Sequence, residues 1–207
     1  MPHQAPSLPP NDASPNVLPA IRQRWSPYRF LPQIVEQEKL TRCLEAARWA
    51  ASSYNDQPWS FLLAKRENHD AFQQALACLL DANRAWAANA GVILLTVMRT
   101  TFRQNGKPNR VALHDLGGAT TSLALQATAE GLQVHQMAGI NLSQVRSAYK
   151  IPTGFEPQTA IAIGYPDERP AANDDPLAAR DAQTRVRLPL SELVFSGEWG
   201  TSANLDG

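Results

Sequence analysis

The stretch Ala51-Ser52-Ser53-Tyr54-Asn55-Asp56-Gln57-Pro58-Trp59 separates a helical pattern from a strand pattern. Upstream of it, apolar residues recur at the spacing of one helical face from about Glu36 to Ala50. Downstream of it, the residues from Trp59 to Ala64 predict a strand. The stretch itself is polar and rich in turn-forming residues, so we expect a helix that ends in a turn and leads directly into a strand.

The short polar side chains of this turn also suggest a ligand site. Donors and acceptors that can satisfy the edge of a heteroaromatic ring are supplied by Ser52, Ser53, Asn55 and Gln57. Serine and asparagine, however, also stabilise turns by bonding their own backbone. The residues alone therefore leave two interpretations open, a ligand site and a stable turn.

The rest of the chain predicts helices that alternate with a few strands. Further helices are expected at about Asn68–Leu80 and Arg110–Gly131, and further strands at Val92–Val97, just before His135, and at Thr159–Ile163. The segments Thr101–Asn109 and Asp167–Asp181 are polar and predict loops, and Arg185–Gly200 shows little regularity. Because helices separate the strands, we expect an α+β fold of the α/β three-layer type, in which helices cover a small central sheet.

Length and composition favour one globular domain without a charged or membrane partner. The chain has 207 residues, and its 19 Lys and Arg balance its 19 Asp and Glu. A net charge of zero gives no field for nucleic acid or for a membrane surface. The longest apolar stretch, Gly91–Met98, is too short to span a bilayer, so we expect a cytoplasmic protein.

The N-terminal segment and the two cysteines each predict a further feature of this domain. Residues 1–19 hold six of the 16 prolines and no signal-peptide pattern, which predicts a disordered lead-in before a single domain at residues 20–207. Cys43 and Cys78 lie among apolar residues of expected helices, which favours two buried thiols. We expect no metal site, because such a site needs more ligands at closer spacing.

Two segments carry arginines that could hold an anion. Arg24, Ser26 and Arg29 lie within six residues, just before the first expected helix. Arg185 and Arg187 are alternate residues of an extended segment, so they share a side. A guanidinium can grip a phosphate with two parallel N–H bonds. A solvated basic patch is the alternative for the first segment.

The segment from His135 to Gly139 indicates a close backbone approach. Small residues at Ala138 and Gly139 let the main chain come near a ligand. His135 is alone among titratable residues there, and a single histidine of this kind is more often structural than catalytic. We therefore expect His135 to support the fold and the following backbone to face a ligand.

The order and spacing of these segments resemble the nitroreductase-like family of FMN-dependent NAD(P)H oxidoreductases. That family has an Arg-x-Ser-x-basic segment, a Pro-Ser-Ser-x-Asn-x-Gln-Pro-Trp block, and a basic pair before a Leu-Pro step. Here the three appear as Arg24-Trp25-Ser26, Ser52–Trp59 and Arg185–Pro189, and the resemblance runs from about Arg22 to Gly200. It implies a nitroreductase-like fold with a small mixed or antiparallel sheet flanked by helices.

The resemblance also implies where an FMN cofactor would lie. Arg24, Arg185 and Arg187 would hold its phosphate, with Trp25 and Ser26 beside them. Asn83 is similar to a family asparagine that bonds the flavin ring, and the residues Gln136, Met137, Ala138 and Gly139 would approach N5, the hydride-accepting atom. Ser52, Ser53 and Asn55 would meet the flavin from the partner subunit. The implied assembly is a homodimer with the flavin at the subunit interface and a C-terminal arm swapped onto the partner.

Two residues depart from the family pattern. Tyr28 stands where the family has a basic residue, and Ala51 stands where it has a proline. Arg29 follows one place later, and we hypothesise that it stabilises the negative charge that builds on the flavin near N1. The exchanges could alter contacts to the ring but leave the phosphate-binding arginines in place.

The implied reaction passes electrons from NAD(P)H through flavin N5 to a small organic acceptor, such as a nitroaromatic or a quinone. No Gly-rich dinucleotide fingerprint follows a strand, so NAD(P)H should bind transiently. The same fold could also serve an enal or semialdehyde reductase, a dehalogenase or a dehydrogenase, and a non-catalytic flavin carrier is a further alternative. Apolar residues on several faces of Arg110–Gly131, together with the apolar tail Leu188–Trp199, favour a dimer.

Overall fold

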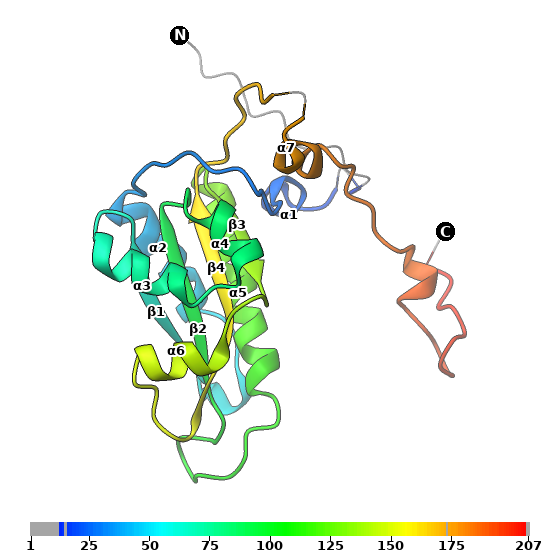
Figure 1. Cartoon of the computed structure of the whole chain (residues 1–207). Coiled ribbons are helices and arrows are strands. Elements are labelled where there is room, and N and C mark those ends of the chain that lie inside the picture. Colours follow the sequence, from blue (N-terminus) through cyan, green and yellow to red (C-terminus); the bar gives the residue numbers. More distant parts are fainter. Residues whose placement is uncertain (1–12, 15, 173, 206–207) are drawn as a thin grey trace.

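The fold is built on one four-stranded antiparallel sheet in the order β1-β2-β4-β3 (Figure 1). This computed structural model describes residues 13–14, 16–172 and 174–205. The strands are β1 (Trp59–Lys65), β2 (Val92–Arg99), β3 (Gln133–Met137) and β4 (Phe155–Gly164). All three pairings are antiparallel, so the antiparallel form of the predicted sheet is the one observed.

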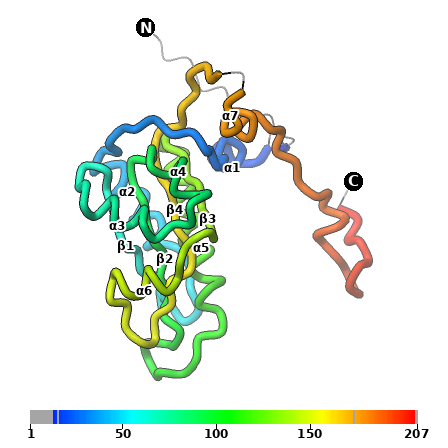
Figure 2. The backbone as a smooth tube through the Cα atoms, viewed as in Figure 1, coloured from blue at the N-terminus to red at the C-terminus, as the bar shows by residue number. Residues whose placement is uncertain are grey.

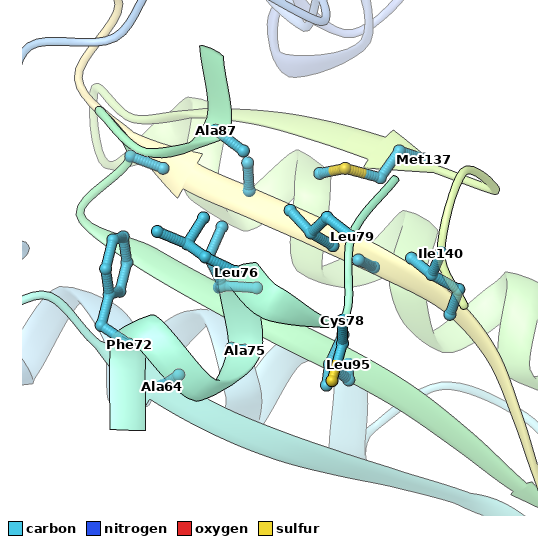
Figure 3. Packing of buried hydrophobic residues seen from close by; sticks show 14 of the residues in the cluster. Ala64, Phe72, Ala75, Leu76, Cys78, Leu79, Ala87, Leu95, Met137 and Ile140 are labelled. Atoms are coloured by element: carbon cyan, nitrogen blue, oxygen red, sulfur yellow. The ribbon is translucent and has the colours of Figure 1, made fainter. Parts of the chain in front are cut away.

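Helices cover both faces of this sheet and give the predicted three layers. On one face α2 (Gln37–Arg48) packs against α5 (Ala112–Ala129). On the other face lie α3 (His69–Ala77), α4 (Asp81–Ala87) and α6 (Leu142–Ala148). Figure 3 shows side chains of the second face packed together in one apolar cluster. Cys43 and Cys78 are both buried and free, as the sequence predicts, one in each apolar layer.

The central strands β2 and β4 explain why the sheet is well specified. The segments Val92–Leu95 of β2 and Ala160–Ile163 of β4 are apolar on both faces and fully buried, as expected for strands covered by helices on each side. The pairing shifts register between Leu95 and Val97. At that bulge the hydroxyls of Thr96 and Thr159 lie 2.8 Å apart, and the Thr159 amide donates to Thr96 Oγ1 at 3.0 Å. The two threonines thus satisfy each other where the pairing is irregular.

Several helices differ from the sequence-based expectation. The expected helix Asn68–Leu80 is α3, which begins at His69 because the Asn68 side chain caps it by accepting from Ala71 N. The short helices α4 and α6 were not predicted, because each spans only seven residues and cannot display a full helical period. The helix expected over Arg110–Gly131 is α5, which is shorter by two residues at each end.

The predicted loop Asp167–Asp181 is partly wrong. Its last residues form the helix α7 (Pro176–Asp181). The Asp175 carboxylate accepts from Leu177 N and Ala178 N, and Pro176 occupies the first helical position. A cap and a proline in these places start a helix even in a polar segment, because they satisfy its first amides and fix its first φ.

The described segments before α2 and after β4 extend beyond the layered body (Figure 1). Of the expected lead-in, residues 1–12 and 15 lie outside the described residues, and helix α1 (Pro19–Gln23) begins at the last of its positions. Beyond α7 the chain extends away from the body, with one 3-10 turn, η2 (Leu190–Glu192) (Figures 1 and 2). This arm exposes apolar side chains, among them Leu188, Leu193 and Trp199, the last 93% exposed. Among the described residues, no helix is long and apolar enough to cross a membrane.

Candidate functional site

A cavity of about 230 Å³ brings together the two arginine segments of the sequence. Its lining residues are Arg24, Trp25, Ser26, Arg180, Asp181, Gln183, Thr184, Arg185 and Arg187. Arg24 and Arg185 lie 161 positions apart in the chain, yet the Arg185 guanidinium donates to the Arg24 carbonyl and, at 3.0 Å, to the Arg22 carbonyl. The predicted meeting of Arg24, Ser26, Arg185 and Arg187 is therefore seen in the structure.

The charges in this cavity are mutually repulsive. Burial, followed by the charge of Arg187, lowers the pKa of Arg24. Burial also lowers the pKa of Arg185, with further contributions from Arg24 and Arg187. Arg24 donates at 3.2 Å to the Ser26 hydroxyl, a neutral partner that offsets no charge. Such a concentration of like charge is stabilised by an anion of matching size.

Trp25 fixes one wall of the cavity. Its backbone amide donates to Gln133 Oε1 at 3.1 Å, which ties the segment to the first residue of β3. The indole is buried, and its Nε1 has no hydrogen-bond partner among the described residues. A buried donor without a partner costs free energy, about 1–3 kcal/mol in typical cases, so a ligand acceptor at this position would stabilise the site.

Four cavity residues were missed by the sequence: Arg180, Asp181, Gln183 and Thr184. Arg180 and Asp181 end the segment that was predicted to be a loop, and Gln183 and Thr184 follow it, so no periodicity drew attention to them. Asp181 accepts the backbone amides of Tyr28 at 2.8 Å and Arg29 at 3.1 Å. The signal that could have found them was the Asp175-Pro176 pair, which is typical of a helix start.

Arg29 lies apart from the other arginines of the predicted site. Its guanidinium donates to the Arg169 carbonyl at 3.0 Å and lies 3.6 Å from carboxylate oxygens of both Asp167 and Asp175. Only 17% of its side chain is exposed. In the single chain this arginine holds the segment that follows β4 to the segment that precedes α2.

Asn83 and Gly139 meet, although 56 positions separate them. Asn83 Nδ2 donates to the Gly139 carbonyl at 3.1 Å, and Leu80 N donates to the same oxygen at 3.0 Å. A Cβ at position 139 would lie 2.3 Å from Asn83 Nδ2, so only glycine permits this approach. Of the neighbouring candidates, Met137 is buried, whereas Gln136 and Ala138 are exposed. Two predicted ring-binding segments therefore form one surface.

His135 lies behind this surface and has a structural environment. Its Nδ1 is 2.8 Å from the Pro27 carbonyl, and its ring centroid lies 4.7 Å from that of Tyr28 and 4.4 Å from that of Trp86. Burial is the main reason why the pKa of His135 is lowered, so the ring is neutral at physiological pH. This geometry favours the structural role expected from the sequence.

The Ser52–Gln57 stretch forms a tight turn around the 3-10 helix η1 (Ser53–Asn55). Tyr54, Asn55 and Gln57 have φ values of 53°, 54° and 50°, a left-handed conformation that costs a non-glycine residue about 1 kcal/mol or more. The turn is held by hydrogen bonds, from Gln57 N to Ser52 Oγ at 3.0 Å and from Ser53 N to Asp115 Oδ2 at 3.1 Å. Strain of this kind is often found at functional sites.

This turn and the arginine cavity lie at opposite ends of the sheet. The turn leads into Trp59, which pairs with Met98 at one end of β2. Lys65, at the other end of β1, pairs with Val92, the first residue of β2. Trp25 is bonded to Gln133, which pairs with Gly164 at that second end. The length of β1, roughly 20 Å, therefore separates the two sets of predicted residues within one chain.

The sequence profile of the Nitroreductase family matches residues 21–165 of this chain. The chain belongs to the nitroreductase family. The predicted resemblance is thereby confirmed. The matched residues include the Arg24 segment, the Ser52–Trp59 block and the Asn83–Gly139 pair, whereas α7 and the Arg185–Arg187 pair lie beyond the match.

Relatives of this nitroreductase-family chain agree in fold over most of its length. A solved structure described as an oxidoreductase containing FMN is 32% identical, with a TM-score of 0.84, covering 93% of this chain and 97% of its own. An uncharacterized 15.4 kDa protein of Mycolicibacterium smegmatis is 31% identical over 125 residues, which is 60% of this chain and 82% of the relative. A nitroreductase-family structure from Clostridium difficile, at 23% identity and a TM-score of 0.66, covers 86% of this chain and 96% of its own and shares the fold.

Proposed function

We propose that this protein binds FMN and passes electrons from NAD(P)H to a small organic acceptor, such as a nitroaromatic or a quinone. One observation carries the proposal: a cavity lined by four arginines lies at the end of the sheet from which β3 leads to the Asn83–Gly139 surface. The 32%-identical relative is described as containing FMN. A second relative, from Streptococcus pyogenes, is 23% identical and carries the name of an NAD(P)H nitroreductase.

The residues present fit the chemistry of a flavin mononucleotide. Its phosphate monoester is a dianion of a size that a cavity of about 230 Å³ can enclose. Burial, and after it repulsion between neighbouring guanidinium groups, lowers the pKa of Arg24 and of Arg185, and a bound dianion would offset both effects. The buried indole Nε1 of Trp25 adds a donor without a partner among the described residues. A basic site of this kind would distinguish FMN from riboflavin, which lacks the phosphate.

When bound, FMN supplies the redox chemistry, because its ring accepts and returns hydride at N5. The protein's part is to bind and orient the ring. Arg24 and Arg187 hold the phosphate end, and Arg185 also fastens the Arg22–Arg24 backbone. Asn83 fixes the Gly139 carbonyl, so the exposed main chain at Ala138 and Gly139 can lie against the ring without a side chain between them.

The proposed active unit is a homodimer. Ser52, Ser53 and Asn55 lie roughly 20 Å from the arginine end within their own chain, so they can reach a flavin only from a second copy. Helix α5 also exposes Leu113 and the pair Gly117-Gly118, where a Cβ would meet open space. These features, with the exposed apolar residues of the C-terminal arm, support a partner that covers α5 and receives the arm.

The acceptor stays open among the reactions that the fold can serve. An enal or semialdehyde reductase, a dehalogenase or a dehydrogenase would use the same flavin and the same Asn83–Gly139 surface. A flavin carrier is the alternative outside enzymes. Anaerobic addition of NAD(P)H separates the classes: an oxidoreductase loses its yellow colour and regains it with a suitable acceptor, whereas a carrier keeps its colour.

The phosphate assignment is tested by a charge-matched pair of variants. Arg24→Ala/Arg187→Ala should lose most of its bound FMN during dialysis. The control Arg48→Ala/Arg169→Ala also removes two positive charges, but from exposed side chains that each pair with one carboxylate away from the cavity, so it should retain its FMN. Flavin absorbance per chain measures both. If the wild-type protein gains no flavin absorbance with added FMN, the proposed function fails entirely.

A further inference from the structure

Helix α7 lies beyond the residues that match the family, yet it contributes an arginine to the cavity. We infer that Arg180 is a fourth phosphate-binding residue and that α7 is the element that positions it. The inference rests on the proposed function, since it takes the cavity to be the site of the FMN phosphate. It adds a residue and an element that neither the sequence pattern nor the family match includes.

Helix α7 is docked by three carboxylate contacts rather than by a large apolar face. Asp175 caps its first amides and lies 3.6 Å from the Arg29 guanidinium. At the other end of the helix, Asp181 accepts the backbone amides of Tyr28 and Arg29. Both ends are thus fixed to the Tyr28–Arg29 segment, which follows directly on the cavity residues Trp25 and Ser26. These contacts at both ends fix where α7 lies, and with it the backbone that carries Arg180.

Arg180 lies on an aromatic platform. Its guanidinium carbon is 4.9 Å from the centroid of the Tyr28 ring. That ring is itself held edge-on by Trp86 at 5.4 Å and by His135 at 4.7 Å. A guanidinium over an aromatic face keeps its N–H donors in its own plane, where they can still bond an anion. The platform therefore orients the charge without using its hydrogen bonds.

Among the described residues that line the cavity, Asp181 is the one that carries a carboxylate, and it does not cancel this role. Its two oxygens accept backbone amides, at 2.8 Å and 3.1 Å, so its charge is already met by two donors. Four arginines line the same cavity. The net charge of the cavity is therefore positive, which favours binding of a phosphate dianion. Asp181 acts on the anion through Arg180, by fixing the end of the helix that carries it.

The role assigned to Arg180 predicts selectivity for a phosphate-bearing flavin. Removing one oriented guanidinium from a phosphate site should weaken FMN binding by about tenfold, the usual scale of a charge-assisted contact. Riboflavin has the same ring and ribityl chain but no phosphate, so its binding should be unchanged. The ratio of the two affinities isolates the phosphate contact from any general effect on the fold or on the ring surface.

The experiment titrates flavin-stripped, full-length protein with FMN and with riboflavin, following the quenching of flavin fluorescence. Arg180→Ala should lower the FMN-to-riboflavin affinity ratio about tenfold, and Arg180→Lys should restore part of it. The control Arg169→Ala removes an exposed arginine from the same segment and should leave both affinities unchanged. A Tyr28→Leu variant, which removes the platform, should shift the ratio in the direction of Arg180→Ala, whereas Tyr28→Phe should not.

The outcomes separate this inference from the proposed function. A wild-type protein that binds neither flavin overturns both. A wild-type protein that prefers FMN, together with an Arg180→Ala variant of unchanged ratio, overturns the inference alone. An Arg180→Ala variant that loses FMN and riboflavin equally also overturns it, because the residue would then support the fold and not the phosphate. Thermal unfolding of each variant identifies any loss of structure.

Discussion

Gly139 and Asn83 show how one missing side chain can specify a site. The Gly139 Cα hydrogen faces the Asn83 amide, and a Cβ there would lie 2.3 Å from Nδ2. Gly139→Ala should therefore push the asparagine away from the Gly139 carbonyl and destabilise the protein by about 1 kcal/mol, the scale of one lost hydrogen bond. The double variant Asn83→Ala/Gly139→Ala should cost less than the sum of the two single variants, because the clash is gone. Urea unfolding of all four proteins measures this coupling, and strict additivity would contradict the contact.

Asp115 of α5 stabilises the strained Ser52–Gln57 turn by accepting a hydrogen bond from it. Its side chain is nearly buried, with 5% exposed, and its Oδ2 accepts the Ser53 amide. Asp115→Ala should lower the free energy of unfolding by about 1 kcal/mol, because the half-buried Ser53 amide loses its partner beside left-handed residues. It should also weaken FMN retention, since the turn can then relax. Asp115→Asn keeps an accepting oxygen and should recover most of both.

The check on Asp115 uses its exposed neighbour. His114→Ala changes an exposed residue of α5 next to Asp115. It should leave the urea midpoint and the flavin content unchanged. If Asp115→Ala lowers stability but keeps full flavin content, the turn's conformation does not matter for the cofactor.

Single site residues could be predicted from the sequence where the residue type alone indicates the ligand, as arginine indicates a phosphate. Arg24, Arg185 and Arg187 were predicted together and line one cavity. Arg180 was missed, because a single arginine in a polar segment has no distinguishing pattern. Arg29 was taken as a flavin residue from its place in the chain, but in this structure its guanidinium faces Asp167 and Asp175. Which carboxylate an arginine meets depends on loops that sequence reasoning does not place.

Among the elements, α2 and α5 are joined by an ion pair between the middle of α2 and the C-terminal end of α5. Arg42 on α2 donates to Glu130, which caps α5, at 2.6 and 2.8 Å. This hydrogen bonding lowers the pKa of Glu130 from its ordinary value near 4.5 to about 2. A carboxyl with a lowered folded-state pKa contributes stability above its unfolded pKa, and that contribution is lost as the pH falls towards the folded value.

Glu130→Gln should therefore change the acid side of the stability curve. At pH 6 the variant should melt at a lower temperature than the wild type. The difference should shrink as the pH falls from about 4.5 to about 2, where the wild-type carboxyl also becomes neutral. Tryptophan fluorescence melts across that range measure it. Glu192→Gln, in the exposed arm, is the control, and a difference that stays constant with pH would contradict the ion pair.

The elements that could be predicted are those with a long or strong pattern. The strands β2 and β4 were found because fully covered strands are apolar on both faces. Helices α2 and α5 were found because they repeat one face over several turns. Helices α4, α6 and α7 are each seven residues or fewer, and capping and packing decide them rather than periodicity. Strand order was out of reach, because it depends on contacts between segments far apart in the sequence.

For the whole molecule, the separation of the Ser52–Asn55 turn from the arginine cavity has a direct consequence. If one flavin needs both, each site takes the turn from one subunit and the cavity from the other. A two-fold dimer then has two identical composite sites. Under this proposal the single chain carries both halves, at opposite ends of its sheet, and would complete neither site alone.

Mixed dimers test this arrangement. One parent carries Arg24→Ala/Arg187→Ala, and the other carries Ser52→Ala/Asn55→Ala, so each homodimer has two defective sites and should bind little FMN. A heterodimer purified through two different tags gathers all the changes in one site and leaves the other intact. It should bind about one FMN per two chains, with wild-type affinity at that site. If each site were built within one chain, both sites of the heterodimer would stay defective and its flavin content would match that of the parents.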